Sequence, residues 1–509
     1  MEHTAAYQRR WQILAVLSLS LVLIGLDTLV IQLALPSVQR ELDTTATQLQ
    51  WVVDAYTLTF GGLLLFAGGL SDRFGRKRVL TIGLLSFLVF TLGAAFAPSG
   101  EALVALRAAM GVSAALIMPA TLAIIKDVFP AQEQGKAIGI WSGAAAIGVP
   151  LGPAVSGLLL DHYWWGSIFL INVPVVAIAV IVGLFLIPES RNPSHPGLDL
   201  LGAALSVTGL VAIVYGIVEA PRHGWDSPAT LGALGAGVVL LALFVWWERR
   251  TSKPMLSVGL FRNVRYGGGA LTITLVAFGL FSALFLLTQY LQFVLALDPM
   301  QAGIRMLAVG TMMLGAPLSP VLVERIGLKL TAAAGMLLCT VAAVMLAGLT
   351  VDAQAQALWG LAVLGLGVGI ALPAGTDAVM VSAPAHQAGA GSAVADAAMQ
   401  IGGTLGIAIT GSVATTLYRD DLGTVPGADI ARDSIGAAAA AAAQLGGDGA
   451  RALLDAANRA FAASLDAAYI SAGVAIAGAL IALLILPRHR QEPAPAEASP
   501  QPEPEPAEL

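Results

Sequence analysis

The stretch Gly68-Gly69-Leu70-Ser71-Asp72-Arg73-Phe74-Gly75-Arg76-Lys77-Arg78-Val79-Leu80 places five charged side chains between two long apolar runs. Each run is long enough for a helix that crosses a bilayer, which needs about 20 apolar residues. Gly75 permits a tight reversal of the chain. Basic residues gather in the cytoplasmic turns of membrane proteins, where they attract anionic lipid. The stretch therefore predicts a cytoplasmic turn between two membrane spans.

The composition of the whole chain agrees with that prediction. Of the 509 residues, 57% are hydrophobic and 11% are charged, whereas soluble domains are about 25% charged. The first apolar run, from Gln12 to Leu35, is too long for a signal peptide and lacks a small-residue cleavage site, so we expect it to stay in the membrane as a helix. The single cysteine, Cys339, excludes an internal disulfide and a cysteine cluster for zinc.

Apolar windows of membrane-spanning length recur about fourteen times along the chain. They are too long and too uniform for the strands of a membrane β-barrel, so helices are predicted throughout. The fold class predicted is an all-α integral membrane protein. The approximate centres of the spans are Ile24, Leu63, Leu88, Ala115, Gly148, Ala177, Leu210, Leu240, Leu280, Met312, Met336, Leu366, Ala398 and Ile476.

The loop charges set the expected orientation. With fourteen spans and a cytoplasmic N-terminus, most of the 26 Lys and Arg residues fall on the inner face, and the short outer loops carry only Arg40, Arg222 and Arg305. This bias predicts that both termini are cytoplasmic. The long outer loop, about 419–464, shows helical spacing from Ala450 to Phe461 and predicts a surface helix or hairpin, with a mobile linker as the alternative.

An internal repeat organises the spans. Glu324-Arg325-Ile326-Gly327-Leu328-Lys329 is a degenerate copy of the opening stretch, 252 residues after Asp72. The three glycines Gly148, Gly152 and Gly157 recur 254 residues later as Gly402, Gly406 and Gly411. Two patterns at nearly one offset indicate a duplication that maps the first six spans onto the last six. Because six is even, both halves enter the membrane from the same side, and a cavity is expected between them near the midplane.

The predicted domains follow from this repeat. Residues 1–190 form an N-terminal six-helix bundle, and residues 191–262 contribute two inserted transmembrane helices with their flanking loops. Residues 263–487 form a C-terminal six-helix bundle that includes the long extracellular loop. The Pro- and Glu-rich segment 488–509 is predicted to be a disordered cytoplasmic tail, since nothing in it could pack into a core.

Three motifs carry a resemblance to a known family. The pattern Gly68-x-Leu70-x-Asp72-Arg73-x-Gly75-Arg76-Lys77-x-x-Leu80 resembles the signature turn of the major facilitator superfamily. Gly148-x-x-x-Gly152-Pro153-x-x-Ser156-Gly157 resembles its antiporter motif, with Ser156 where the family usually has Gly. Leu26-Asp27, followed by Ala34-Leu35-Pro36, resembles the span-one motif of fourteen-helix drug:proton antiporters, with Leu29 and Gln32 in place of the usual Thr and Asn.

The resemblance covers about residues 10–487, and the Trp51-Val52-Val53-Asp54-Ala55-Tyr56 segment is most similar to exporters of quaternary ammonium compounds and other drugs. It implies the major facilitator fold and efflux of lipophilic cations, driven by inward proton flow across a bacterial cytoplasmic membrane. It also implies a contribution to antibiotic resistance. The expected partners are small-molecule substrates, protons and the lipid bilayer, with no nucleic acid, no cofactor and no metal.

Acidic side chains within the spans are the candidate functional residues, because each costs about 2.5–3.5 kcal/mol to insert. They are Asp27, Asp54, Asp377 and Asp396, and Arg107 is the one base placed comparably. Asp27 is the first choice for the proton carrier. A carboxyl in an apolar interior tends to bind a proton and a nearby guanidinium favours its ionised form, so motion between Asp27 and Arg107 would switch protonation. The alternative is a static ion pair that fixes two spans.

The other acids are candidates for substrate binding. Asp54 lies near the aromatic residues Trp51 and Tyr56, and a carboxylate beside aromatic faces can hold a lipophilic cation. The alternative is an interfacial aromatic belt with a solvated acid. Asp377 and Asp396 lie towards the inner ends of their spans, where either could receive a substrate from the cytoplasm. Helix capping or hydration is the alternative for Asp377.

Two motifs are expected to control conformational change. Gly68, Asp72, Arg73, Gly75, Arg76 and Lys77 are predicted to form a latch that favours one conformation, and the alternative is that the turn serves topology alone. The antiporter-motif residues Gly148, Gly152, Pro153 and Gly157 have small-x-x-x-small spacing, which allows close helix contact. A seal between the moving halves is predicted there, with simple close packing as the alternative.

Other functional classes fit the sequence less well. A dedicated exporter of one natural product or metabolite remains the alternative within transport. A membrane enzyme is disfavoured because the six histidines, His3, His162, His195, His223, His386 and His489, lie in tails or loops. Motifs for metal-dependent hydrolysis or nucleotide binding are absent from the sequence, so an ATP-driven pump is disfavoured too.

Overall fold

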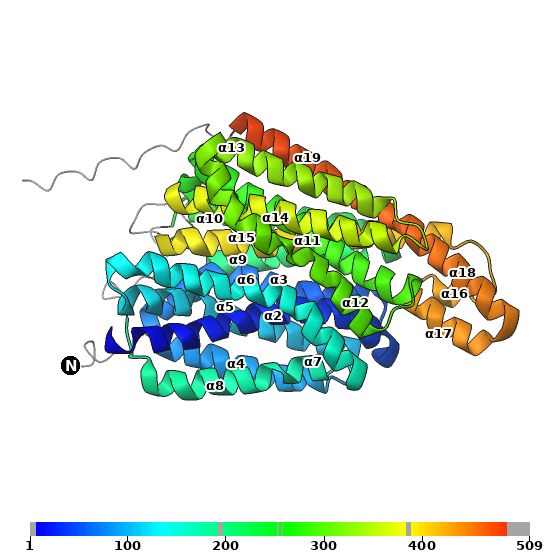
Figure 1. The fold of residues 1–509 in the computed structure, drawn as a ribbon, viewed down its shortest axis with the longest axis horizontal. Helices are drawn as coiled ribbons and strands as arrows, with labels where there is room; N and C mark the ends of the chain where they lie inside the picture. The colour runs from blue at the N-terminus through cyan, green and yellow to red at the C-terminus, as the bar shows by residue number, and fades with distance from the viewer. Residues whose placement is uncertain (1–6, 192–196, 252–253, 257, 383–387, 486–509) are drawn as a thin grey trace, which may run out of the picture.

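The computed structural model describes residues 7–191, 197–251, 254–256, 258–382 and 388–485. Throughout these residues the regular structure is helical, with no strand. Most of the helices run along the long axis of the molecule, and the first described helix begins at one end of it (Figure 1). This arrangement confirms the predicted all-α fold class. The tail predicted at 488–509 lies outside the described residues.

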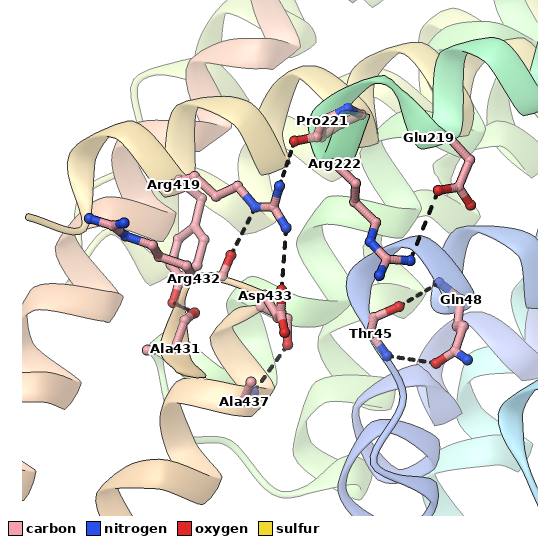
Figure 2. Close-up of polar contacts among 12 residues, drawn as sticks. Thr45, Gln48, Glu219, Pro221, Arg222, Arg419, Ala431, Arg432, Asp433 and Ala437 are labelled. Carbon is pink, nitrogen blue, oxygen red and sulfur yellow. Dashed lines mark hydrogen bonds and ion pairs between the residues drawn. The ribbon is translucent and has the colours of Figure 1, made fainter. Parts of the chain in front are cut away.

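The N-terminal bundle is built from the first six predicted spans. Within it α2 packs against α6 and α8, and α5 packs against both α3 and α4. Side-chain caps begin several helices; at α3, Thr45 accepts from the Gln48 amide while Gln48 accepts from the Thr45 amide (Figure 2). The helices are α2 (Arg10–Leu42), α3 (Ala46–Phe74), α4 (Arg76–Ala95), α5 (Gly100–Val128), α6 (Ala131–His162), α7 (Ser167–Leu170) and α8 (Asn172–Leu186).

The C-terminal bundle repeats this order of contacts. Its first helix, α11, packs against α15 and α19 as α2 packs against α6 and α8, and α13 packs against α14. The elements are η1 (Val258–Arg262), α11 (Val264–Gln289), the π-helical turn η2 (Tyr290–Val294), α12 (Pro299–Met306), η3 (Leu307–Thr311), α13 (Met312–Ala347), α14 (Gln354–Ser382), α15 (Ala388–Asp421) and α19 (Ala468–Ile485).

The two turns of the sequence repeat have the same backbone feature. Gly75 separates α3 from α4 with φ 114° and ψ 129°. Gly327 interrupts α13 with φ 84° and ψ 159°. Both values lie in a region that glycine enters at little cost, so each glycine lets one helix end and the next begin. The predicted duplication is therefore visible in the backbone.

Many of the helices are long and apolar enough to span a membrane. By length and apolar composition, twelve helical segments of the described residues could cross a membrane. One of them, Pro299–Ala347, has 49 residues and contains the break at Gly327, so it is long enough for two passes. A further helix of 32 residues, α6, runs beside α2 in the same bundle. The chain is thus a multi-pass membrane protein.

The inserted pair α9 (Leu200–His223) and α10 (Pro228–Glu248) packs beside both bundles. Helix α10 contacts α9, and α9 also contacts α3 of the first bundle and α15 of the second. Val214 and Val218 of α9 share an apolar cluster with Leu58 of α3 and Ala408 of α15. The insert therefore covers the line along which α3 and α15 meet.

A small helical cap projects beyond the spans, at the end of the molecule away from the start of α2 (Figure 1). We call α16 (Ala428–Ala431), α17 (Ile435–Leu445) and α18 (Gly447–Ser464) the cap. The surface helix predicted around Ala450 to Phe461 is confirmed by α18. We call this end of the molecule the cap end, and the end that carries the Arg73–Arg78 turn the basic end.

The cap contacts both bundles through polar side chains. Gln39 of α2 donates to Ser434, the residue that caps α17, over 2.5 Å. Arg419, near the end of α15, donates to the Pro221 carbonyl of α9 and pairs with Asp433 at 3.3 Å (Figure 2). Gln292 of η2 donates to the Leu33 carbonyl of α2 over 2.7 Å. These contacts join the two bundles towards the cap end.

Candidate functional site

Asp27 and Arg107 form an ion pair inside the N-terminal bundle. The Arg107 Nη1 donates to Asp27 Oδ2 over 2.6 Å, and the side chains are 0% and 2% exposed. Arg107 also donates from Nε to the Val52 carbonyl over 3.1 Å, and its guanidinium lies 4.2 Å from the centre of the Tyr56 ring. The two residues predicted for proton coupling are thus brought together, and helices α2, α3 and α5 meet at the pair.

Asn172, at the start of α8, completes the surroundings of Asp27. Its Nδ2 donates to Asp27 Oδ1 over 2.9 Å, and Asn172 is 1% exposed. The sequence analysis did not identify this residue. The available signal was a lone amide in the apolar run that forms the sixth span, because a polar group at membrane depth needs a partner.

Asp54 lies on α3 and is fully buried. Neither of its carboxylate oxygens has a hydrogen-bond partner among the described residues. An ionised carboxylate in such a position lacks the contacts that normally offset the loss of its hydration. Asp54 is therefore placed to take a proton or a positively charged guest.

The aromatic residues predicted to surround Asp54 point to different partners. The Trp51 ring lies 6.3 Å from the ring of Tyr215 on α9. The Tyr56 ring lies against Arg107, within the N-terminal bundle. Trp51 is thus turned towards α9, whereas Tyr56 is turned into the N-terminal bundle.

Asp377 and Asp396 lie in the C-terminal bundle towards the basic end. Asp377, on α14, pairs with Arg265 of α11 at 3.4 Å, and its side chain is 34% exposed. Its charge is thus balanced by a neighbour that the sequence analysis did not assign to it. Asp396 is half-buried on α15, one helical turn before Gln400.

The basic turn is held by acidic residues from two helices and from the segment that follows α8. Arg76 pairs with Asp72 at 3.1 Å and with Asp127, at the end of α5, at 3.0 Å. Beyond the end of α8, Glu189 accepts from the Lys77 amide over 3.2 Å and pairs with Arg78 at 3.6 Å. Asp72 is thus paired with a base of the same turn. Asp127 and Glu189 were not identified from the sequence.

Three further residues of the turn have distinct surroundings. A Cβ added at Gly75 would lie 2.6 Å from the nearer oxygen of Glu189, so there is no room for a side chain. The φ of 114° at Gly75 is also one that residues other than glycine rarely adopt. A Cβ added at Gly68 would lie 3.6 Å from Pro119 of α5, which is ordinary contact. The Arg73 guanidinium lies 5.5 Å from the centre of the Phe74 ring.

The antiporter-motif segment of α6 contacts the other bundle at its cap end. A Cβ added at Gly157 would lie 2.8 Å from the Pro299 carbonyl oxygen at the start of α12. Ser156, the residue that departs from the motif, donates to the Val30 carbonyl of α2 over 3.0 Å. Gly152 is buried. The surroundings of Gly148 and Pro153 lie outside the described side chains.

Two paired helical bundles with buried charges and a basic turn define a secondary transporter of the kind built from parallel repeats. The profile of the Major Facilitator Superfamily matches residues 17–407. The chain belongs to this superfamily.

Similar proteins and a solved structure support the assignment to this superfamily. The chain is 37% identical to the "Multidrug efflux pump LfrA" of Mycolicibacterium smegmatis, over 94% of each chain. It is 35% identical to the "Methyl viologen resistance protein SmvA" of Salmonella typhimurium, over 91% of this chain and 96% of that one. Its fold is similar to the crystal structure of a bacterial homologue of the human lysosomal transporter Spinster in an inward-facing, occupied conformation. The TM-score is 0.67 and the identity 17%, over 95% and 99% of the two chains.

Proposed function

We propose that this protein is a proton-coupled antiporter that exports lipophilic, cationic drugs and toxic compounds across the cytoplasmic membrane of a bacterium. Transport moves these molecules without covalent chemistry, and the chain's own acidic side chains exchange protons. The relatives named for multidrug efflux and for methyl viologen resistance support this function.

The observation that carries the proposal is the isolation of Asp54. A fully buried carboxylate without a hydrogen-bond partner is unstable as an anion unless a positive charge arrives. A proton and an organic cation can each supply that charge, and they exclude one another. Such competition at one acid is what an exchange of protons for cations requires.

Asp27 has a different part in this proposal. Its partners come from α5 and α8, so a shift of α2 against those helices would lengthen the contact with Arg107. Separation would leave the carboxylate without its counter-charge, and proton uptake would then offset the cost of burial. Asp27 would thus link protonation to the position of α2.

The surplus of negative charge favours a cationic substrate. Arg107 and Arg265 are each matched by an acidic partner, Asp27 and Asp377 respectively. Asp54, whose carboxylate oxygens have no hydrogen-bond partner among the described residues, adds negative charge beyond these pairs. The partners that follow are positively charged lipophilic molecules, protons and the surrounding lipid.

The two bundles are proposed to pivot about the region between them. The domain limits proposed here, at about residues 190 and 262, lie between α8 and α9 and between α10 and α11. In the proposed orientation the basic end, with both termini, faces the cytoplasm and the cap end faces outwards. Opening towards the outside would separate the contacts of Gln39 and Gln292, while the basic turn holds the cytoplasmic ends of α3, α4 and α5 together.

Efflux assays in cells and in proteoliposomes test this function. Export of both ethidium and benzalkonium, accelerated by an inward proton gradient, is expected. Export that is indifferent to the gradient would refute proton coupling. Export of only one compound class would indicate the dedicated exporter instead.

A further inference from the structure

Helices α3 and α15 meet in a regular antiparallel register, and we call this contact the seam. Thr57 and Thr404 are joined by a hydrogen bond of 2.6 Å between their hydroxyl oxygens. Four residues further along α3 and four residues back along α15, a Cβ added at Gly61 would lie 2.7 Å from the Gln400 Cβ. In the other direction, seven residues back along α3 and seven residues further along α15, Gly411 lies against the side-chain amide of Gln50.

This register places the carboxylates of both bundles on one line. Asp54 lies between Gln50 and Thr57 at helical spacing, so it shares their face of α3. Asp396 precedes Gln400 by one turn and shares the seam face of α15. The seam therefore carries a polar side chain at nearly every helical turn.

In order from the cap end to the basic end, these polar side chains are Gln50, Asp54, Thr57 with Thr404, Gln400 and Asp396. Polar atoms that have no partner in the described part of the chain lie on both sides of the hydroxyl pair. They are both carboxylate oxygens of Asp54 and Oε1 of Gln400, and these two residues are 0% and 3% exposed. Buried polar atoms of this kind are usually satisfied by water.

The inserted helix α9 separates the seam from lipid. Helix α9 runs beside α3 over most of the length of α3. Towards the basic end, a Cβ added at Gly69 would lie 3.5 Å from Leu198, which comes just before α9. Towards the cap end, the ring of Trp51 lies 6.3 Å from the ring of Tyr215. Near Tyr215, Val214 and Val218 share an apolar cluster with Leu58 and Ala408, which flank the seam. A row of polar groups facing hydrocarbon would be costly. Covered by α9, the row is enclosed by protein.

We propose that the seam is a proton path, in which the Thr57 and Thr404 hydroxyls carry the proton from Asp54 towards Asp396. The proposal rests on the proposed proton-coupled function and adds its route. It also gives the inserted pair a role, because α9 encloses the path. Asp27 is not on this route, since its partners lie in α5 and α8.

The transfer conserves every atom. The carboxyl of Asp54 releases its proton to a water, because it has no direct hydrogen bond to Thr57. That water passes a proton to the hydroxyl oxygen of Thr57, which passes its own hydrogen to Thr404. Thr404 in turn passes its hydrogen to water held at Gln400 Oε1, and the water delivers a proton to Asp396. Both hydroxyls end with one hydrogen each and then rotate back, so no oxidant or reductant is needed. A hydroxyl can accept and donate at once, which valine cannot.

Substrate-driven proton flux tests the path. The full-length protein is placed in proteoliposomes that contain a pH-sensitive dye, and ethidium is added outside. Thr57→Val and Thr404→Val are each expected to slow proton flux at least about tenfold, while ethidium affinity stays within about twofold of the original. The double variant should be no slower than the slower single one, since the two hydroxyls act as one unit.

Matched variants separate a relay from a structural role. Thr59→Val removes a hydroxyl from the same helix that donates to Ala108 of α5, away from the seam, and flux should persist. Thr57→Ser and Thr404→Ser keep the hydroxyl and should retain flux. Flux within about twofold of the original protein in both valine variants, or loss of flux together with ethidium binding, would overturn the path. Absence of ethidium-driven flux in the unmodified protein would instead refute the proposed function, and the path with it.

Discussion

Asp27→Asn, Arg107→Met and their combination give a direct test of the buried ion pair. Removing one partner of a fully buried pair typically costs about 3–5 kcal/mol, because the remaining charge is left without compensation. The structure predicts that the two single changes differ. Arg107 cannot lose its proton, whereas Asp27 can gain one and so relieve an unbalanced charge.

The partners that remain after each change set the expected magnitudes. In Asp27→Asn, Arg107 keeps the Val52 carbonyl and the Tyr56 face but stays charged, so we expect a loss of about 3 kcal/mol. In Arg107→Met, Asp27 keeps the Asn172 amide and can bind a proton, so a loss of about 1–2 kcal/mol is expected. The double variant should lose less than the two single losses combined, with a coupling of at least about 1 kcal/mol.

Unfolding free energies in detergent, combined as a double-mutant cycle, measure this coupling. Additive losses would refute the energetic importance of the pair. Transport then separates the two interpretations of Asp27. If it carries protons, Asp27→Asn abolishes proton-driven efflux although the protein stays in the membrane, and the double variant remains inactive even where stability recovers. Normal efflux by the double variant would show that the pair is a static ion pair that only fixes two spans.

The remaining predictions concern the basic turn and the seam acids. Gly75→Ala should lower the free energy of unfolding by about 1–2 kcal/mol, because the position has φ 114° and the new Cβ would meet Glu189; unchanged stability in detergent would contradict this. Arg76→Gln should slow export while ethidium affinity is kept, since its two acidic partners are released; normal export would leave the turn a role in topology alone. Asp54→Asn and Asp396→Asn should weaken binding of divalent organic cations more than monovalent ones, and equal weakening would argue against charge recognition.

The sequence predicted those features that depend on local chemistry. The apolar windows indicated the spans, because the bilayer fixes their length. The repeat of Gly75 at Gly327 was visible because both turns need the same backbone conformation. Asp27 and Arg107 could be paired in advance because charges are rare within the spans and each needs a partner.

Long-range pairing could not be predicted in the same way. The acids that hold the basic turn, Asp127 and Glu189, lie at span ends, where charged residues are common and carry no mark of their partner. Tyr56 was expected beside Asp54. However, residues two positions apart in a helix point in different directions, and the Tyr56 ring lies against Arg107 instead. The register that joins Thr57 to Thr404 depends on how two bundles dock, which no local pattern in either helix specifies.

The exchange of a cation for a proton is tested most directly by proton movement in proteoliposomes held without a membrane potential. When an ethidium gradient is imposed, protons should move in the opposite direction at a rate that depends on the protein, and an imposed pH difference should drive ethidium in return. Ethidium transport that leaves the internal pH unchanged, and that ignores the imposed pH difference, would contradict the account.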